Sequence, residues 1–202
     1  MLAIDYSKAL NGVHFPVPSD DVLAAWRWAV ENADQLGVRP DLLHIGGASA
    51  GGNLVAGVVA RIRDAGEPLP ASEVLVYPVL HPVLPTPSPE LSAKLATLDG
   101  AGMDPVTSRY LNLNFVGSEE SLADLYAFAG NGDASGLPPV YILNSDVDQL
   151  RASGEEYGRQ ITAAGGQVVV ELEPGAHHGH LDQPYSAAGQ ASVDRIAHWL
   201  TT

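Results

Sequence analysis

Cysteine is absent from the 202-residue sequence. Its absence excludes disulfide bonds, thiolate zinc sites and a cysteine nucleophile. Basic residues are scarce as well: ten Lys and Arg stand against 24 Asp and Glu, which gives a net charge of −14. Because such a charge repels phosphate backbones, we expect no nucleic-acid partner. The sequence also lacks an uninterrupted apolar run of about 18 residues, so no membrane span is predicted.

The size and composition of the sequence fit one globular domain. Of its 202 residues, 46% are hydrophobic and 17% are charged, a balance typical of folded rather than disordered chains. We therefore expect a single domain over residues 1–202. The first ten residues lack the basic start and the long apolar run of a secretory signal, so with Met1 as the start we expect a cytoplasmic location.

Short apolar runs alternate along the chain with helical periodicity. The expected strands cover residues 2–4, 42–45, 74–77, 139–143 and 168–172. Helices are expected between them, the first opening at Ser19 and the last covering residues 192–200. Continuous apolar strands separated by helices predict an α/β fold, with a mostly parallel sheet and flanking helices.

Residues 79–137 interrupt this rhythm, with several prolines near their start. Two short helices are expected there, opening at Ser88 and at Asp104. An excursion of this kind usually forms a wall or lid over a site. Three of its side chains are candidates for lining a pocket, with core packing as the equal alternative: Met103, Tyr110 and Phe115.

The clearest functional motif is a G-x-S-x-G, Gly47-Ala48-Ser49-Ala50-Gly51, which lies between the second expected strand and the following helix. A nucleophile elbow needs this context, because a sharp turn lifts the serine clear of the sheet and only small neighbours fit. The backbone N–H of Ala50 would point at a developing oxyanion, beside the positive end of the helix. The alternative interpretation is an ordinary glycine-rich turn.

A serine hydroxyl needs a base to take its proton, and in a fold of this kind the chain order is serine, acid, histidine. Two acids, Asp146 and Asp148, follow the fourth expected strand. Three histidines, His177, His178 and His180, follow the fifth. The residues themselves leave open which acid and which histidine would serve.

The three histidines could instead form a metal site. Adjacent histidines point in different directions, however, and no carboxylate lies at helical spacing beside them. We therefore expect no metal ion and no cofactor.

Several segments resemble one known family. The nucleophile segment of the hormone-sensitive-lipase group of α/β-hydrolases, the microbial carboxylesterases, is similar to Gly46-Gly47-Ala48-Ser49-Ala50-Gly51-Gly52-Asn53-Leu54. The strand that follows in the family resembles Tyr77-Pro78-Val79-Leu80. The acid loop resembles Asp148-x-Leu150-Arg151, and the histidine loop resembles Pro174-Gly175-x-x-His178-Gly179. The resemblance runs from about Ile4 to the end of the sequence.

This resemblance implies an α/β-hydrolase fold and a serine carboxylesterase that hydrolyses small, short-acyl esters through an acyl-enzyme, without a cofactor. It places the catalytic triad on Ser49, Asp148 and His178, with the N–H of Ala50 in the oxyanion hole. It also implies a homodimer formed through the last strand and the last helix, residues 168–172 and 192–200.

The sequence departs from the family pattern at two places that matter. The family usually has an aromatic residue after His-Gly, where this sequence has His180. The family also carries a His-Gly-Gly-Gly loop well before the elbow, whose N–H groups complete the oxyanion hole, and no such run exists here. Residues 3–6 instead resemble the strand after that loop, so the resemblance implies an N-terminally truncated fold.

Three explanations of the missing loop stay open. The sequence is a fragment, or another chain supplies the missing part, or a reduced fold pairs the strand of Ile4 directly with the strand of Ile45. Losing one oxyanion donor typically costs about 10²–10³ in rate. The alternative to an active esterase is therefore an impaired or inactive α/β-hydrolase, or one part of an assembly.

Overall fold

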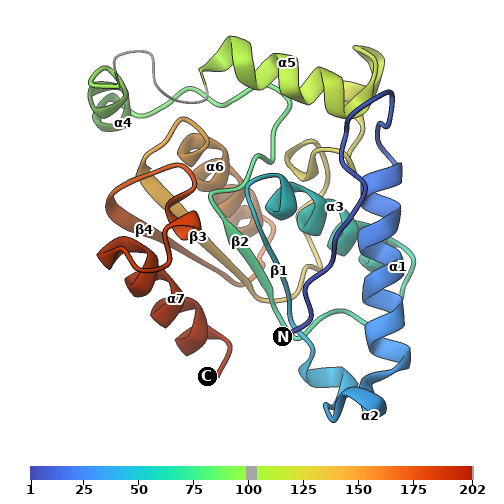
Figure 1. Cartoon of the computed structure of the whole chain (residues 1–202). Coiled ribbons are helices and arrows are strands. Elements are labelled where there is room, and N and C mark those ends of the chain that lie inside the picture. The colour runs from blue at the N-terminus through green and yellow to red at the C-terminus, as the bar shows by residue number, and fades with distance from the viewer. Residues whose placement is uncertain (99–103, 202) are drawn as a thin grey trace.

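A parallel sheet lies at the centre of the computed structural model, which describes residues 1–98 and 104–201 (Figure 1). Over these ranges the sheet has four strands in the order β1-β2-β3-β4. They are β1 (Ile45–Ala48), β2 (Glu73–Val76), β3 (Val140–Val147) and β4 (Val168–His177). Each neighbouring pair runs parallel, so the predicted parallel architecture is confirmed.

Helices cover both faces of this sheet. The helices are α1 (Val17–Glu31), α2 (Ala33–Leu36), α3 (Ala50–Asp64), α4 (Pro89–Leu95), α5 (Pro105–Val116), α6 (Arg151–Ala163) and α7 (Ala187–Trp199). Short 3-10 turns are η1 (Pro40–Leu42), η2 (Glu120–Ala123), η3 (Ala129–Asn131) and η4 (His180–Asp182). Helices α3 and α6 lie on one face of the sheet and α7 lies on the other (Figure 1).

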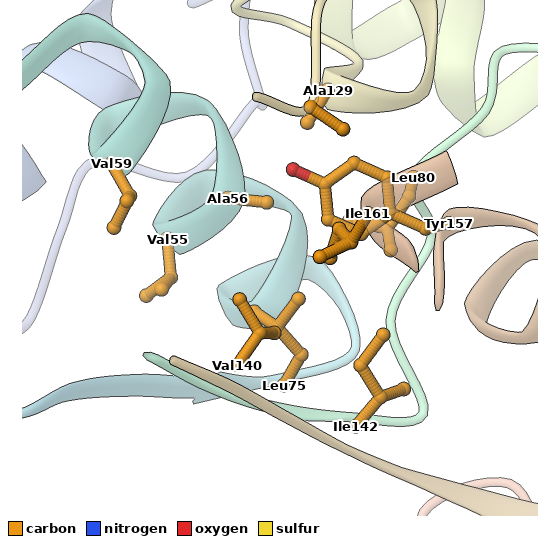
Figure 2. Packing of buried hydrophobic residues seen from close by; sticks show 11 residues of the cluster. Val55, Ala56, Val59, Leu75, Leu80, Ala129, Val140, Ile142, Tyr157 and Ile161 are labelled. Atoms are coloured by element: carbon orange, nitrogen blue, oxygen red, sulfur yellow. The ribbon is translucent and has the colours of Figure 1, made fainter. Parts of the chain in front are cut away.

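The larger apolar core lies between the sheet and the α3 and α6 face. Val59 of α3, Leu75 of β2, Ile142 of β3 and Tyr157 of α6 are buried together there (Figure 2). Burying apolar surface stabilises a fold by about 25 cal/mol per Å². This core therefore fixes α3 and α6 against the strands, and with them the turns at which β1 and β3 end.

A smaller cluster holds α7 on the opposite face. Tyr141 of β3 stacks on Trp199 of α7 with ring centroids 5.4 Å apart. Helix α1 packs on α3, where Trp26 and Ile62 belong to a second buried cluster that Ile45 of β1 also borders. The strands are thus covered by helices that also carry the loops at their carboxyl ends.

The excursion between β2 and β3 contains the two expected helices, α4 and α5, beyond the carboxyl ends of the strands (Figure 1). The side chain of Ser88 accepts the N–H of Leu91 at the start of α4. The side chain of Asp104 accepts the N–H groups of Val106 and Thr107 at the start of α5. Both predicted helix starts are confirmed. None of the helices in the described ranges combines the length and the apolar content needed to cross a bilayer.

Predictions about the beginning of the chain are wrong. Residues 2–4 form no strand, and β1 pairs with β2 alone among the described strands, so the reduced pairing of Ile4 with Ile45 does not occur. The side chains of Leu2 and Ile4 are 53% and 40% exposed, because this short run finds no apolar surface to cover it. The second expected strand, residues 42–45, begins only at Ile45, because the chain turns at η1 first.

The first helix also begins earlier than Ser19. Helix α1 starts at Val17, and Pro18 lies in its first turn, where a missing N–H costs nothing. Ser19 is buried within the helix, and its hydroxyl accepts a hydrogen bond from Arg61 of α3 at 3.0 Å. A serine predicted as a helix cap therefore joins two helices instead.

Candidate active site

The turn from β1 to α3 gives Ser49 an unusual backbone. Its φ is +53° and its ψ is −116°, a backbone conformation that residues other than glycine rarely adopt. A Cβ on Gly47 would lie 2.4 Å from the backbone of Gly51, and one on Gly52 would lie 3.1 Å from the carbonyl oxygen of Gly47. The close approach of the strand to the helix therefore requires glycine at position 47 and favours it at position 52, whereas a Cβ on Gly51 would meet no atom within 4 Å.

Ser49 is hydrogen-bonded to one predicted partner, His178, which is hydrogen-bonded in turn to the other, Asp148. Ser49 Oγ lies 2.9 Å from His178 Nε2, and His178 Nδ1 lies 2.7 Å from Asp148 Oδ2. The other oxygen of Asp148 accepts the N–H of Leu150 at 3.0 Å, so the carboxylate is held on both sides. The Asp148 side chain is 2% exposed, whereas that of His178 is 26% exposed. This arrangement can move a proton from Ser49 to His178 and stabilise the imidazolium that results.

The alternative acid, Asp146, does not reach His178. Its carboxylate accepts hydrogen bonds from Lys94 of α4, from Arg151 of α6 and from the N–H of Gly175. Partial burial raises the pKa of Asp146, but the hydrogen bonds from Lys94 and Gly175 and the positive charges of Lys94 and Arg151 together hold that pKa below its usual value. The ionised Asp146 side chain thus links the segment that follows β3 to the segment around Gly175 that precedes His178.

The other two histidines of the cluster lie away from Ser49. His177 is exposed at the end of β4. His180 is 7% exposed and hydrogen-bonds to two serines, Ser145 and Ser192. In the described part of the chain, no group of three or more His, Asp or Glu side chains has an arrangement suited to a metal ion.

The predicted oxyanion donor follows the nucleophile directly. Ala50 is the first residue of α3. The first N–H groups of a helix have no carbonyl partner within the helix, and they carry its positive partial charge. Asn53 anchors this end of α3, because its side-chain amide donates to the carbonyl oxygens of Val79 at 2.9 Å and Ala127 at 2.8 Å.

A cavity of about 440 Å³ opens beside Ser49 and Ala50. Its walls are mostly apolar and come from several parts of the chain, with Leu10 before α1, Leu54 of α3 and Phe115 of α5 as examples. Phe115 therefore lines the cavity as one of the three candidates, whereas Tyr110 points outward and is 71% exposed. Met103 lies outside the described residues.

The sequence reasoning missed the contribution of the segment before α1 to this cavity. Residues 6–10 line it next to Ser49. The segment is fixed by the N–H of Ser7, which donates to Asp21 of α1, and by the carbonyl of Ala9, which accepts from Asn114 of α5. No motif marks these residues, because backbone groups make both contacts.

Comparison with known proteins places this site in context. A family model described as alpha/beta hydrolase fold matches residues 1–182. Carboxylesterase NlhH of Mycobacterium tuberculosis is 35% identical over 183 residues, covering 90% of this chain and 56% of the relative. Ethyl acetate hydrolase of Pseudomonas putida is 30% identical over 181 residues, covering 88% and 55%. The chain thus spans about half the length of these curated relatives.

Solved structures agree with this picture. The structure of EstE1, a thermophilic carboxylesterase cloned from a metagenomic library, is similar with a TM-score of 0.86 and 31% sequence identity. The match covers 97% of this chain and 66% of that one. A hyperthermophilic esterase from Pyrobaculum calidifontis also has a TM-score of 0.86, at 26% identity.

Proposed function

The chain belongs to the alpha/beta hydrolase fold family that matches its residues 1–182, and on that premise we propose that it is a serine carboxylesterase acting on small, short-acyl esters. One observation carries the proposal. Ser49, on a strained turn beside an apolar cavity, is hydrogen-bonded to His178, which is hydrogen-bonded in turn to the buried Asp148. These three residues are the proposed catalytic triad, with Ala50 as an oxyanion donor.

In the proposed mechanism each of these residues has a role. His178 Nε2 takes the proton of Ser49 Oγ as that oxygen attacks the ester carbonyl, and the N–H of Ala50 stabilises the oxyanion that forms. The alcohol leaves with the proton from His178, and an acyl-enzyme remains on Ser49. His178 then activates a water that releases the acid, while Asp148 holds the imidazole in one orientation throughout.

The substrate class is supported by the cavity and by the relatives. The apolar walls beside Ser49 suit an acyl chain better than a charged group. Two relatives are named a carboxylesterase and an ethyl acetate hydrolase, and ethyl acetate is a small, short-acyl ester. No step of the proposed reaction uses a metal ion or a cofactor.

A second candidate function, an impaired hydrolase or one part of an assembly, rests on a different observation. The sequence contains no His-Gly-Gly-Gly run. Over the described ranges, the side of β1 that faces away from β2 carries no strand. If further oxyanion donors are needed, another polypeptide would have to supply them at this edge.

Association through the other edge of the sheet is also proposed. Strand β4 pairs with β3 on one side, and among the described strands none covers its other side. Val169 and Val170 on this strand are 39% and 40% exposed. We infer a homodimer formed through β4 and α7. The cytoplasmic location and the lack of a nucleic-acid partner stay predictions from the sequence.

Hydrolysis of p-nitrophenyl acetate and butyrate by the purified chain tests the proposal, with Ser49→Ala measured beside it. We expect turnover of both esters by the wild type and its loss in the variant, because removal of the nucleophile leaves no acyl-enzyme route. Equal background rates in both proteins would contradict the esterase and favour the second candidate.

A further inference from the structure

A second chain of hydrogen bonds runs beside the proposed triad, and the proposed reaction uses none of its members. Ser145 Oγ lies 2.9 Å from His180 Nδ1, and His180 Nε2 lies 2.9 Å from Ser192 Oγ. Ser192 Oγ donates to Glu173 Oε2 at 2.8 Å. Ser145 and Ser192 are fully buried, and His180 and Glu173 are 7% and 6% exposed.

The hydrogen bonds between these four side chains fit one arrangement of protons. Glu173 is ion-paired with Arg195, so its carboxylate accepts and Ser192 donates to it. The oxygen of Ser192 is then the acceptor for His180, which places a proton on Nε2 of that ring. Nδ1 of a neutral His180 is left as an acceptor for the hydroxyl of Ser145. Burial lowers the pKa of His180 by more than the backbone of His177 and the nearby carboxylates of Asp148 and Asp182 raise it, which favours this neutral form.

Two sets of contacts connect these buried, hydrogen-bonded side chains to His178. The ring of Tyr77 meets His178 edge to face at 4.9 Å and His180 edge to face at 5.1 Å. Ser145 holds His180, and the next residue, Asp146, accepts the N–H of Gly175. Neighbouring residues at the end of β3 thus fasten the histidine loop on both sides of His178.

We propose that Ser145, His180, Ser192 and Glu173 form a positioning relay that holds His178 in hydrogen-bonding register with Ser49. The inference rests on the proposed esterase function. It makes His180 a positioning residue that acts through Tyr77 and the loop backbone. A neutral His180 also keeps a second positive charge away from His178 when that ring takes a proton, and like charges at this range oppose each other.

Replacement of Ser192 tests the relay, with a matched control on the same helix. Ser192→Ala removes the acceptor of His180 Nε2 and the donor to Glu173. Ser186→Ala removes the serine that caps α7 by accepting the N–H of Gly189, and the side chain of that serine hydrogen-bonds to Gly189 and Gln183, neither of which belongs to the relay. Ser145→Ala breaks the relay from its other end, should Ser192→Ala fail to fold.

We expect Ser192→Ala and Ser145→Ala each to lower kcat for p-nitrophenyl butyrate by about tenfold, with KM changed by less than about twofold. Ser186→Ala should lower Tm but leave kcat within about twofold of the wild type. Unchanged kcat in both relay variants, beside an active wild type, would overturn the positioning role.

A measurement on the resting protein separates this inference from the esterase itself. Long-range ¹H–¹⁵N spectra of the histidine rings should show His180 neutral, with its proton on Nε2, at a pH at which an unperturbed histidine already takes up a second proton. The ring signals of His178 should move in Ser192→Ala and stay in place in Ser186→Ala. A charged His180, or His178 signals that Ser192→Ala leaves unchanged, would overturn the relay. Failure of the wild type to hydrolyse esters would instead count against the proposed function.

Discussion

At the scale of single residues, the neighbouring acids Asp146 and Asp148 have different tasks although both are ionisable and mostly buried. Asp148 accepts from His178 and Leu150, whereas Asp146 accepts from Lys94, Arg151 and the histidine loop. The pairing of β3 with β4 is irregular between Ser145 and Val147. Asp146 lies within this irregular stretch and bonds to Gly175, whereas Asp148 follows it and bonds to His178. The sequence gives no sign of the irregular pairing, so the spacing of the acids and histidines alone could not assign these partners.

Substitution of the two acids separates their roles. Asp148→Asn should lower kcat/KM for p-nitrophenyl butyrate by about 10³–10⁴, because an amide favours the wrong tautomer of the histidine. Asp146→Asn should cost less than about tenfold, because Asp146 does not reach His178. Steady-state kinetics of both variants provides the test, with circular dichroism as the control for folding. The reverse order of the two losses would assign the acid to Asp146.

Glu73 is a second residue whose environment predicts a measurable effect. It is fully buried at the start of β2, neither of its carboxyl oxygens has a hydrogen-bond partner, and burial raises its pKa from 4.5 to about 8. The folded state therefore keeps the proton between these values while the unfolded state loses it. Stability is unaffected below the unfolded pKa, falls as the pH rises towards 8, and stays low above it.

Glu73→Gln removes this dependence, because its amide does not ionise in either state. We expect the variant to match the wild type in unfolding free energy near pH 4 and to exceed it by a growing margin up to about pH 8. Urea denaturation of both proteins across this range gives the comparison. A constant difference between the two proteins at all pH values would contradict a buried, protonated Glu73.

At the scale of elements, the buried parts of the fold were predictable and the exposed beginning was not. Strands β2 and β3 could be predicted from the sequence because each contains a continuous apolar run, which is typical of strands buried on both faces. The run at residues 2–4 has the same composition but no surface to cover, so it forms no strand. An apolar run indicates that a segment can be buried. It does not indicate whether a neighbouring strand is present for the segment to pair with.

The proposed homodimer belongs to this scale as well. Val169→Lys places a charge on the exposed part of β4, and charges on an edge strand discourage pairing between chains. We expect the wild type to sediment as a dimer and the variant as a monomer in analytical ultracentrifugation at the same concentration. A wild type that is already monomeric, or a variant that stays dimeric, would rule out this interface.

At the scale of the whole molecule, the parallel sheet gathers the proposed triad residues at the carboxyl ends of its strands. The elbow after β1, the acid after β3 and the histidine at the end of β4 come from distant parts of the chain, and the parallel strands bring them to the same edge (Figure 1). The order of the motifs predicted this convergence. It did not predict that residues 6–10 would form a wall of the cavity, because their contacts are made by backbone groups.

Covalent labelling by a fluorophosphonate tests the central claim most directly, because the reagent reacts with a serine only when a base activates it. Intact mass and peptide mapping should show one adduct per chain, on Ser49, and His178→Ala should slow its formation at least about 10²-fold. An adduct on another residue, no adduct at all, or equal labelling of His178→Ala would contradict a Ser49 activated by His178.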